Sequence, residues 1–386
     1  MLNRIFYKVA RRFMRILCWF LPIQSNKIVF SSFCGRGYGD NPKYIFEALV
    51  KMGVDYQMIW MINDEKEIES LPEGMIPCKV GSLQWIYHLT TAKVWVDNCR
   101  NPFYYKKKGQ YYIQTWHGFA LKRIEMDVQD NLEKVYVDLA KKDSKRTDII
   151  ISDSKFMTNI YEKSFWYDGK IVEWGAPRND IFIQQSGLEE SKKEICAFYN
   201  MPKNYKIVLY APTFRADGSL EPYQIDLERV KASCENRFGG EFIVLVRLHP
   251  NIAKKSTELA FDWNKHLDAS GYPDMQVLLA ASDVVISDYS SLMFDFALSG
   301  KPCFQFATDI EAYKNDRNFY FQLDSLPFSV SENNDELVKE IQSFDEEKYQ
   351  QKLNRFFETV GMNQTGGASK KCAELIVEIC EQENLC

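Results

Sequence analysis

Short apolar runs alternate with helical patterns along most of the chain. The run KIVFSS at 27–32 is followed by the glycine-rich stretch 35–41 and by a helical pattern over 41–53, with Pro42 in its first turn. Further runs rich in β-branched and aromatic residues lie at 56–62, 92–98, 109–118, 147–154 and 170–175. Strands that alternate with helices in this way predict an α/β domain built on a parallel sheet.

A second series of apolar runs begins at Lys206 and predicts a second α/β domain. Its runs lie at 206–214, 241–250, 275–291 and 302–306, and a helical pattern covers 368–381. The stretch between the two series is polar and helix-prone. We therefore predict an amphipathic segment at 1–22, Rossmann-like domains at 23–184 and 206–386, and a linker at 185–205. Two doubly wound domains predict a ligand in the cleft between them, at the carboxyl ends of their strands.

The amino-terminal pattern differs from the rest, because apolar and basic residues occupy opposite sides of one helical wheel. The apolar positions are Leu2, Ile5, Phe6, Val9, Phe13, Ile16, Leu17 and Phe20, and the basic ones are Arg4, Lys8, Arg11, Arg12 and Arg15. Such a helix, ended by Pro22, is too short and too charged to span a bilayer and suits an anionic membrane surface. Docking on the protein's own core and a signal peptide are the alternatives, although Arg15 interrupts the apolar stretch.

Composition narrows the function classes. A chain of 386 residues with 46% hydrophobic and 26% charged residues is neither disordered nor a multi-span membrane protein. The net charge of -5 gives no reason to expect nucleic acid as a partner. Ten cysteines without a CxxC pair or a zinc-ligand spacing favour reduced thiols in the cytoplasm, and no carboxylate cluster demands a metal.

Two histidines follow predicted strands, where α/β proteins place reactive groups. His117, in QTWHGFALKR, can accept a proton from an attacking hydroxyl near neutral pH, and Lys122 with Arg123 can meet phosphate charge. His249 ends the run FIVLVRLHP together with Arg247, whose guanidinium suits phosphate oxygens. Structural roles, namely a hydrogen-bonded loop histidine and an ion-paired arginine, remain alternatives.

The strongest local signal is DVVISDYSSLMFDFALSGKP at 283–302, where an apolar strand changes into a serine-capped helix. Hydroxyls and unpaired backbone N–H groups at a helix start bind anions, so Ser290 and Ser291 predict a phosphate site flanked by Asp288 and Asp295. Plain N-capping is the alternative. Two weaker segments also lie at strand ends and have turn chemistry as their alternative; they contain Arg178, Asn179 and Asp180, and Thr213 and Arg215.

Taken in order, these segments resemble the CDP-glycerol glycerophosphotransferase family of teichoic acid and related capsule synthesis. The resemblance rests on FSSFCGRGYGDNPKYIFEAL, AKVWVDNCRNP, QTWHGFALKRI, GAPRNDIF, YAPTFR, RLHP, SDYSSLMFDF and FATDIEAY with RNFYF. It implies a two-domain GT-B-like fold, peripheral attachment to the cytoplasmic leaflet and release of CMP. Phe119 departs from the small hydroxyl residue often found after WHG in that family.

Carried over by position, the resemblance implies a role for each segment. His117 would be the catalytic base, while His249 and Arg247 would hold the donor pyrophosphate and the serines a phosphate. The implied reaction moves a polyol phosphate from a CDP-polyol to a lipid-linked polymer, with glycerol and ribitol both open and Mg²⁺ possible. A glycosyltransferase that uses a nucleotide sugar and a non-catalytic nucleotide-binding subunit are the competing functions, and no oligomeric state is indicated.

Overall fold

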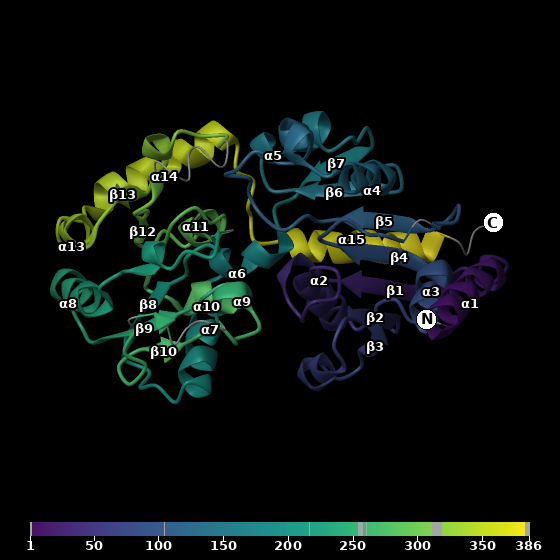
Figure 1. Ribbon diagram of the computed structural model, residues 1–386, viewed down its shortest axis with the longest axis horizontal. Coiled ribbons are helices and arrows are strands. Elements are labelled where there is room, and N and C mark those ends of the chain that lie inside the picture. Colours follow the sequence, from purple (N-terminus) through teal and green to yellow (C-terminus); the bar gives the residue numbers. More distant parts are fainter. Residues whose placement is uncertain are drawn as a thin grey trace. The chain divides into compact units, whose positions relative to one another are not determined.

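Two parallel sheets organise the chain, one in each of two units (Figure 1). The computed structural model describes residues 2–103, 105–215, 217–253, 258–259, 261–310 and 319–382, and for 2–9, 70 and 250 it describes the backbone alone. Unit 1 comprises Met1–His117, Glu125–Asp180 and Asn363–Cys386, and unit 2 comprises Gly118–Ile124 and Ile181–Met362. The predicted α/β class with two parallel sheets is confirmed.

The sheet of unit 1 has seven strands in the order β3-β2-β1-β4-β5-β6-β7, and each neighbouring pair is parallel. The strands are β1 (Gln24–Ser31), β2 (Gln57–Ile62), β3 (Ile76–Lys79), β4 (Ala92–Asp97), β5 (Tyr111–Gln114), β6 (Ile149–Ser152) and β7 (Lys170–Glu173). The helices are α1 (Leu2–Trp19), α2 (Asp40–Lys51), α3 (Leu83–Thr91), α4 (Lys134–Ser144), α5 (Lys155–Ser164) and α15 (Ala368–Glu381). Short helical turns lie at η1 (Glu65–Ser70), η2 (Glu125–Asn131) and η3 (Pro177–Asn179), and α6 (Asp180–Ile183) follows η3.

Alternation along the central strands supplies a core on each face of this sheet. In β1, Ile28 and Phe30 pack with residues of α2 and α15, while Val29 on the other face packs with Trp85 and Leu89 of α3. Every one of these side chains except Trp85 is less than 3% exposed. The sheet is therefore covered on both sides, as its continuous apolar strands predict.

The sheet of unit 2 has the order β10-β9-β8-β11-β12-β13 and is also parallel throughout. Its strands are β8 (Lys206–Tyr210), β9 (Phe242–Val246), β10 (Leu267–Asp268), β11 (Val284–Ser287), β12 (Cys303–Phe306) and β13 (Ser329–Ser331). Its helices are α7 (Gln185–Phe198), α8 (Leu227–Phe238), α9 (Pro250–Ala253), α10 (Met275–Ala281), α11 (Leu292–Ala297), α13 (Asn334–Gln342) and α14 (Glu346–Val360). Turns of 3-10 helix lie at η4 (Glu221–Tyr223) and η6 (Leu323–Ser325).

Three features differ from the sequence-based interpretation. The apolar run 275–281 is the helix α10 rather than part of a strand, because the Asp274 side chain accepts a hydrogen bond from Gln276 N and caps a helix. Most of the predicted linker forms α7, which packs against α10 inside unit 2. The last helix, α15, belongs to unit 1, where its apolar residues Cys372 and Ile376 pack with α2 (Figure 1).

Candidate functional site

His117 lies three residues after β5, on a loop of unit 1. Its Nδ1 is 2.6 Å from the backbone oxygen of Asn98. Since a carbonyl oxygen can only accept, Nδ1 carries the proton and Nε2 of the neutral ring is the acceptor. No hydrogen bond to Nε2 is formed by any residue that the structure describes. Burial lowers the pKa of His117, which keeps the ring in this neutral form.

The His117 loop is held by polar groups at the start of α2. Asn41 Nδ2 donates to the backbone oxygens of Thr115, at 3.3 Å, and of Trp116, at 3.0 Å. Trp116 has a φ of 51°, a conformation that costs energy outside glycine and that these bonds help to maintain. The ring of Trp116 lies 4.3 Å from that of His117. The imidazole is therefore positioned by its neighbours on both sides.

The three polar residues of GAPRNDIF lie in unit 1, where Arg178 and Asp180 have the following contacts. Arg178 Nη1 forms a buried ion pair with Asp40 Oδ2 at 2.7 Å. The carboxylate of Asp180 accepts hydrogen bonds from the backbone N–H groups of Ala368, at 3.1 Å, and Ser369, at 2.8 Å, and so caps α15. Asn179, which lies between Arg178 and Asp180 in the sequence, is the last residue of η3 and is buried. These contacts are structural, and a donor-binding role for the three residues stays a prediction.

Unit 2 contains a pocket of about 260 Å³ at the carboxyl ends of its strands. The sheet order places the reversal of strand order between β8 and β11, and ligands of doubly wound sheets bind at such a point. The pocket is lined by Ala211, Pro212, Thr213, Phe214, Arg247, Leu248, His249, Ser270, Met275, Ser290 and Leu292. The structure thus brings together Thr213, Arg247, His249 and Ser290, which come from the ends of β8, β9 and β11.

Arg247 and His249 have defined orientations in this pocket. Arg247 Nη1 donates to the backbone oxygen of Tyr272 at 2.6 Å, which fixes the plane of the guanidinium. Burial lowers the pKa of Arg247. His249 Nδ1 accepts a hydrogen bond from Asn251 N at 3.2 Å, and its ring stacks on Phe214 at 5.4 Å. Nδ1 is therefore the acceptor, and Nε2 is the nitrogen that carries a proton and can donate to an anion.

The segment 283–302 provides one pocket serine and a short helix, α11. Ser290 lines the pocket, whereas the Ser291 side chain makes no capping hydrogen bond to α11. Because α11 has only 6 residues, the field at its start is weaker than that of a long helix. Asp295 is buried and accepts a hydrogen bond from Gln276 Nε2 at 2.9 Å, which ties α11 to α10.

Arg215 and Asp288 are bonded to one another instead of facing solvent. Arg215 Nη1 lies 2.8 Å from Asp288 Oδ2, and Arg215 Nε lies 2.6 Å from Asp309 Oδ2. Thr213 N also donates to Asp288, so the Asp288 carboxylate joins the loops after β8 and β11. A carboxylate used in this way does not fit a Mg²⁺ site, which needs open oxygen ligands. Among the described residues there is also no group of three or more metal-ligand side chains.

The segment after His117 belongs to unit 2. Lys122 forms an isolated antiparallel bridge with Phe319, and Arg123 lies over the ring of Tyr320 at 5.3 Å. Phe119 packs in an aromatic cluster with Phe294 at 4.5 Å, which explains an apolar residue at this position. The motif residues 311–318 and the side chains of Arg4 and Lys8 lie outside the described part of the chain.

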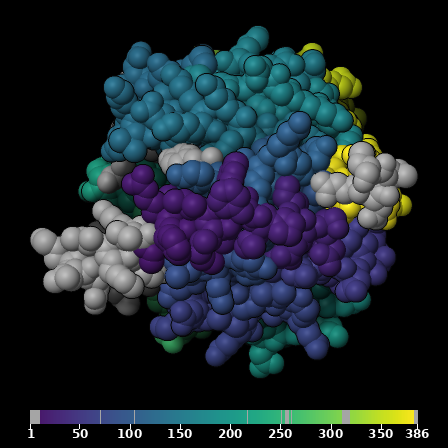
Figure 2. Space-filling view, turned by 90° about the vertical axis from the view of Figure 1, so that its right-hand side faces the viewer, coloured from purple at the N-terminus to yellow at the C-terminus, as the bar shows by residue number. Residues whose placement is uncertain are grey.

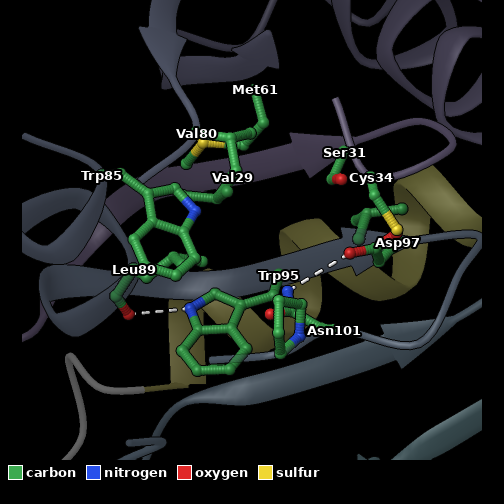
Figure 3. Close-up of a pocket in the computed structure, with 12 residues that line it drawn as sticks. Val29, Ser31, Cys34, Met61, Val80, Trp85, Leu89, Trp95, Asp97 and Asn101 are labelled. Atoms are coloured by element: carbon green, nitrogen blue, oxygen red, sulfur yellow. Dashed lines mark hydrogen bonds between the residues drawn. The ribbon is translucent and has the colours of Figure 1, made fainter. Parts of the chain in front are cut away.

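Sequence reasoning missed Asn98, whose carbonyl orients His117, and Asn41, which holds the loop. Both belong to segments that carry the family resemblance, but their roles depend on strand adjacency. Unit 1 has a second pocket, at the carboxyl ends of β1 and β4, lined by apolar residues such as Trp85 and Trp95, with Asp97 and Cys34 at one end (Figure 3). Its volume of about 40 Å³ is close to that of one water molecule, so it admits no nucleotide.

Known proteins resemble this chain both in sequence and in structure. The sequence profile of the CDP-Glycerol:Poly(glycerophosphate) glycerophosphotransferase family matches residues 13–378. The chain belongs to this family. A structure of the wall teichoic acid polymerase TagF has a TM-score of 0.85 and 29% identity and covers 100% of this chain and 99% of its own, which confirms the GT-B-like fold.

Relatives in this glycerophosphotransferase family differ in length. The teichoic acid poly(glycerol phosphate) polymerase of Staphylococcus epidermidis is 33% identical over 92% of this chain but only 51% of its own length. The teichoic acid glycerol-phosphate transferase of Staphylococcus aureus is 31% identical over 91% of this chain and 92% of its own. The chain thus spans about half the length of some of its relatives and nearly all of others.

Proposed function

We propose that this chain transfers glycerol phosphate, or another polyol phosphate, from a CDP-polyol to a hydroxyl of a lipid-linked teichoic acid or capsule polymer, with release of CMP. The observation that carries the proposal is the pocket of unit 2, where Arg247, His249 and Ser290 line one cavity at a topological switch point. Arginine, a donating imidazole and a hydroxyl together suit the oxygens of a pyrophosphate. Family membership and relatives that act on glycerol phosphate support the choice of donor.

On the acceptor side, His117 is proposed as the general base. Its Nδ1 proton is directed to Asn98, so Nε2 can take the proton of the polymer hydroxyl as the oxygen attacks the β-phosphorus. The bond from that phosphorus to the bridging oxygen of CMP breaks as the new phosphodiester forms. Arg247 and His249 stabilise the charge on the leaving CMP, and the loss of one such donor commonly costs about 3 kcal/mol.

The reaction is tested by incubating the purified chain with CDP-glycerol and a lipid-linked acceptor and by measuring the released CMP. We expect release with the CDP-polyol, and a loss of about 10²- to 10⁴-fold in His117→Ala, as is typical when a general base is removed. Release that occurs only with nucleotide sugars would favour a glycosyltransferase. Cellular function that persists in both His117→Ala and His249→Ala would favour a non-catalytic nucleotide-binding subunit.

We also propose that α1 attaches the chain to the cytoplasmic face of an anionic membrane. Several apolar side chains of its last two turns and of the residue that follows are exposed, with Phe13 at 61%, Ile16 at 54% and Phe20 at 82%. Figure 2 shows the amino-terminal segment, in purple, on the surface of the molecule. Exposing a row of apolar side chains to water costs free energy, and this cost is removed when the row is buried at the boundary of lipid headgroups and acyl chains.

The opposite side of α1 packs on the rest of unit 1 through two arginines and through the apolar side chains of Met14 and Cys18. The guanidinium of Arg11 lies 5.5 Å from the ring centre of Trp85, and that of Arg15 lies 5.1 Å from Tyr105. Arg12 is exposed beside the apolar row. Membrane binding therefore relies on apolar insertion, with Arg12 available to anionic lipid. Within the described residues, no helix has the length and hydropathy needed to cross a bilayer.

The membrane proposal is tested by sedimentation with phosphatidylglycerol vesicles. Replacing Phe13, Ile16, Leu17 and Phe20 by serine should abolish sedimentation while leaving the side of α1 that contacts unit 1 intact. Val135→Ser with Phe198→Ser is the matched control, because both side chains are exposed and apolar elsewhere on the surface. Unchanged sedimentation of the α1 variant would refute this part of the proposal.

A further inference from the structure

Two cysteines, Cys34 and Cys99, follow the adjacent strands β1 and β4 at the point in unit 1 where the strand order reverses. Cys34 is exposed and Cys99 is half-buried, whereas the other cysteines that the structure describes are all buried. The loops that carry the two cysteines are joined by a hydrogen bond from Phe33 N to Asn98 Oδ1. Cys34 Sγ also lies 3.9 Å from the backbone oxygen of Arg100, and Figure 3 shows this sulfur beside Asp97.

Each cysteine adjoins a residue that contacts His117. The backbone oxygen of Asn98, the residue before Cys99, accepts a hydrogen bond from His117 Nδ1 at 2.6 Å. Phe33, next to Cys34, places its ring 5.7 Å from the imidazole, and Phe33 N donates to Asn98 Oδ1 at 2.7 Å. The two cysteine loops therefore meet at the residues that orient the imidazole.

The turn that carries Cys34 is strained and firmly held. Phe33 and Cys34 have φ angles of 44° and 58°, which are uncommon for residues other than glycine. Asn63 Nδ2 donates to the Cys34 carbonyl at 2.9 Å, and Asn63 N donates to Gly35 O at 2.8 Å. A turn fixed in this way resists movement of its own backbone, so the backbone shift needed to join the two sulfurs falls on the Cys99 loop.

We propose that Cys34 and Cys99 form a reversible redox switch, in which a peroxide oxidises the pair to a disulfide that displaces the Asn98 carbonyl from His117. The Cys34 thiolate attacks one peroxide oxygen, the O–O bond breaks, and hydroxide leaves a sulfenic acid on Cys34. The Cys99 thiol then attacks the Cys34 sulfur, the S–O bond breaks, and water leaves. In sum, two thiols and one hydrogen peroxide give one disulfide and two waters.

The environment of Cys34 favours this reaction. Interaction with the Cys99 side chain, helped by the charge of Arg36, lowers the pKa of Cys34 to about 7, so a large share of this thiol is thiolate at neutral pH. The neighbouring Cys34, together with burial, raises the pKa of Cys99, which suits a resolving thiol that reacts second. Oxidation should accordingly become faster as the pH rises through 7.

A disulfide requires a sulfur–sulfur distance of about 2.05 Å, shorter than a hydrogen bond between thiols. Bringing the two sulfurs to this distance moves the backbone of the Cys99 loop. Because Asn98 is the adjacent residue, its carbonyl moves as well. A displacement of about 1 Å at a catalytic group costs on the order of 10²-fold in rate. The effect on catalysis rests on the proposed function of His117, whereas formation of the disulfide does not.

The test treats the full chain with hydrogen peroxide at pH 7 and digests it without reductant. Mass spectrometry should find a peptide that links Cys34 to Cys99 and that disappears after dithiothreitol, and Cys34→Ser and Cys99→Ser should both lack it. CMP release by the oxidised chain should fall at least about tenfold and recover on reduction. Each serine variant, compared with its own reduced sample, should change less than about twofold.

The imidazole signals in NMR provide a readout that does not depend on activity. The chain has four histidines, so His117→Gln identifies the signal of His117, and oxidation should shift its titration midpoint in the unmodified chain only. A chain that releases no CMP when reduced contradicts the proposed function, while the linked peptide and this shift still decide the switch. Absence of the linked peptide, or full linkage with an unchanged His117 signal, would overturn the switch.

Discussion

Replacing Asp180 by alanine separates the structural role of this residue from the donor-binding role suggested by its sequence position. Its Oδ1 accepts hydrogen bonds from Gln364 Nε2, at 2.9 Å, and Ala368 N, at 3.1 Å. Its Oδ2 accepts from Ser369 N, at 2.8 Å, and Ser369 Oγ, at 2.6 Å. The substitution leaves these donors, including two N–H groups in the first turn of α15, without their acceptor.

The size of the effect follows from these contacts. Loss of an N-cap side chain alone costs about 0.5–2 kcal/mol, and hydrogen bonds to a charged group contribute about 1.5–3 kcal/mol each without being additive. We therefore expect Asp180→Ala to lower the unfolding free energy of unit 1 by about 2–4 kcal/mol. Glu374→Ala is the matched control on the same helix, because its exposed pair with Lys370 is worth about 0–1 kcal/mol.

Tryptophan fluorescence during urea unfolding measures this effect in unit 1. The chain has eight tryptophans, and only Trp263 falls in unit 2. At a temperature where the variant is folded, its KM for CDP-glycerol should equal that of the unmodified chain within about twofold. A variant with unchanged stability and a much higher KM would refute the capping account and favour contact with the donor.

Three further predictions concern the pocket and two titrating groups. Arg247→Lys should raise the KM for the donor about 10- to 100-fold because lysine lacks the guanidinium fork, while Arg237→Lys, an exposed arginine of the same unit, should leave it unchanged. The kcat/KM should fall as the pH drops through the pKa of His117, and because burial lowers that pKa, the fall should begin below the usual histidine range of about 6.5. Burial also lowers the pKa of His88 to about 4, so the unfolded state binds a proton that the folded state does not between about pH 6.5 and 4. Stability should decrease as the pH falls through that window, by less than about 3 kcal/mol, and His88→Gln should flatten this part of the urea-midpoint profile.

Periodicity was sufficient to predict the α/β class and most central strands, because buried parallel strands leave continuous apolar runs. It failed for 275–281, since an apolar run of that length suits a buried helix equally well, and the cap at Asp274 decides between them. It also failed for α15, whose apolar stripe fits a core of either unit. A local sequence pattern does not specify whether a helix that follows unit 2 in the sequence packs in the core of unit 1 or of unit 2.

Site residues could be predicted from the sequence where they directly follow a predicted strand. His117, Arg247, His249 and Ser290 each follow a strand, and three of them line one pocket in unit 2. By contrast, Arg215 looks the same in sequence whether it faces a phosphate or pairs with carboxylates 73 and 94 residues away, as it does here. The role of Asn98 was equally hidden, because it arises from the adjacency of β4 and β5.

The fate of the β-phosphorus tests the proposed reaction most directly. CDP-glycerol labelled with ³²P at the phosphate next to glycerol is incubated with the chain and a lipid-linked acceptor, and the polymer and the released nucleotide are separated. Attack at this phosphorus predicts that the label enters the polymer, that unlabelled CMP is released in equal amount, and that His117→Ala slows both by about 10²- to 10⁴-fold. Label that remains with a released nucleotide as CDP would contradict the account.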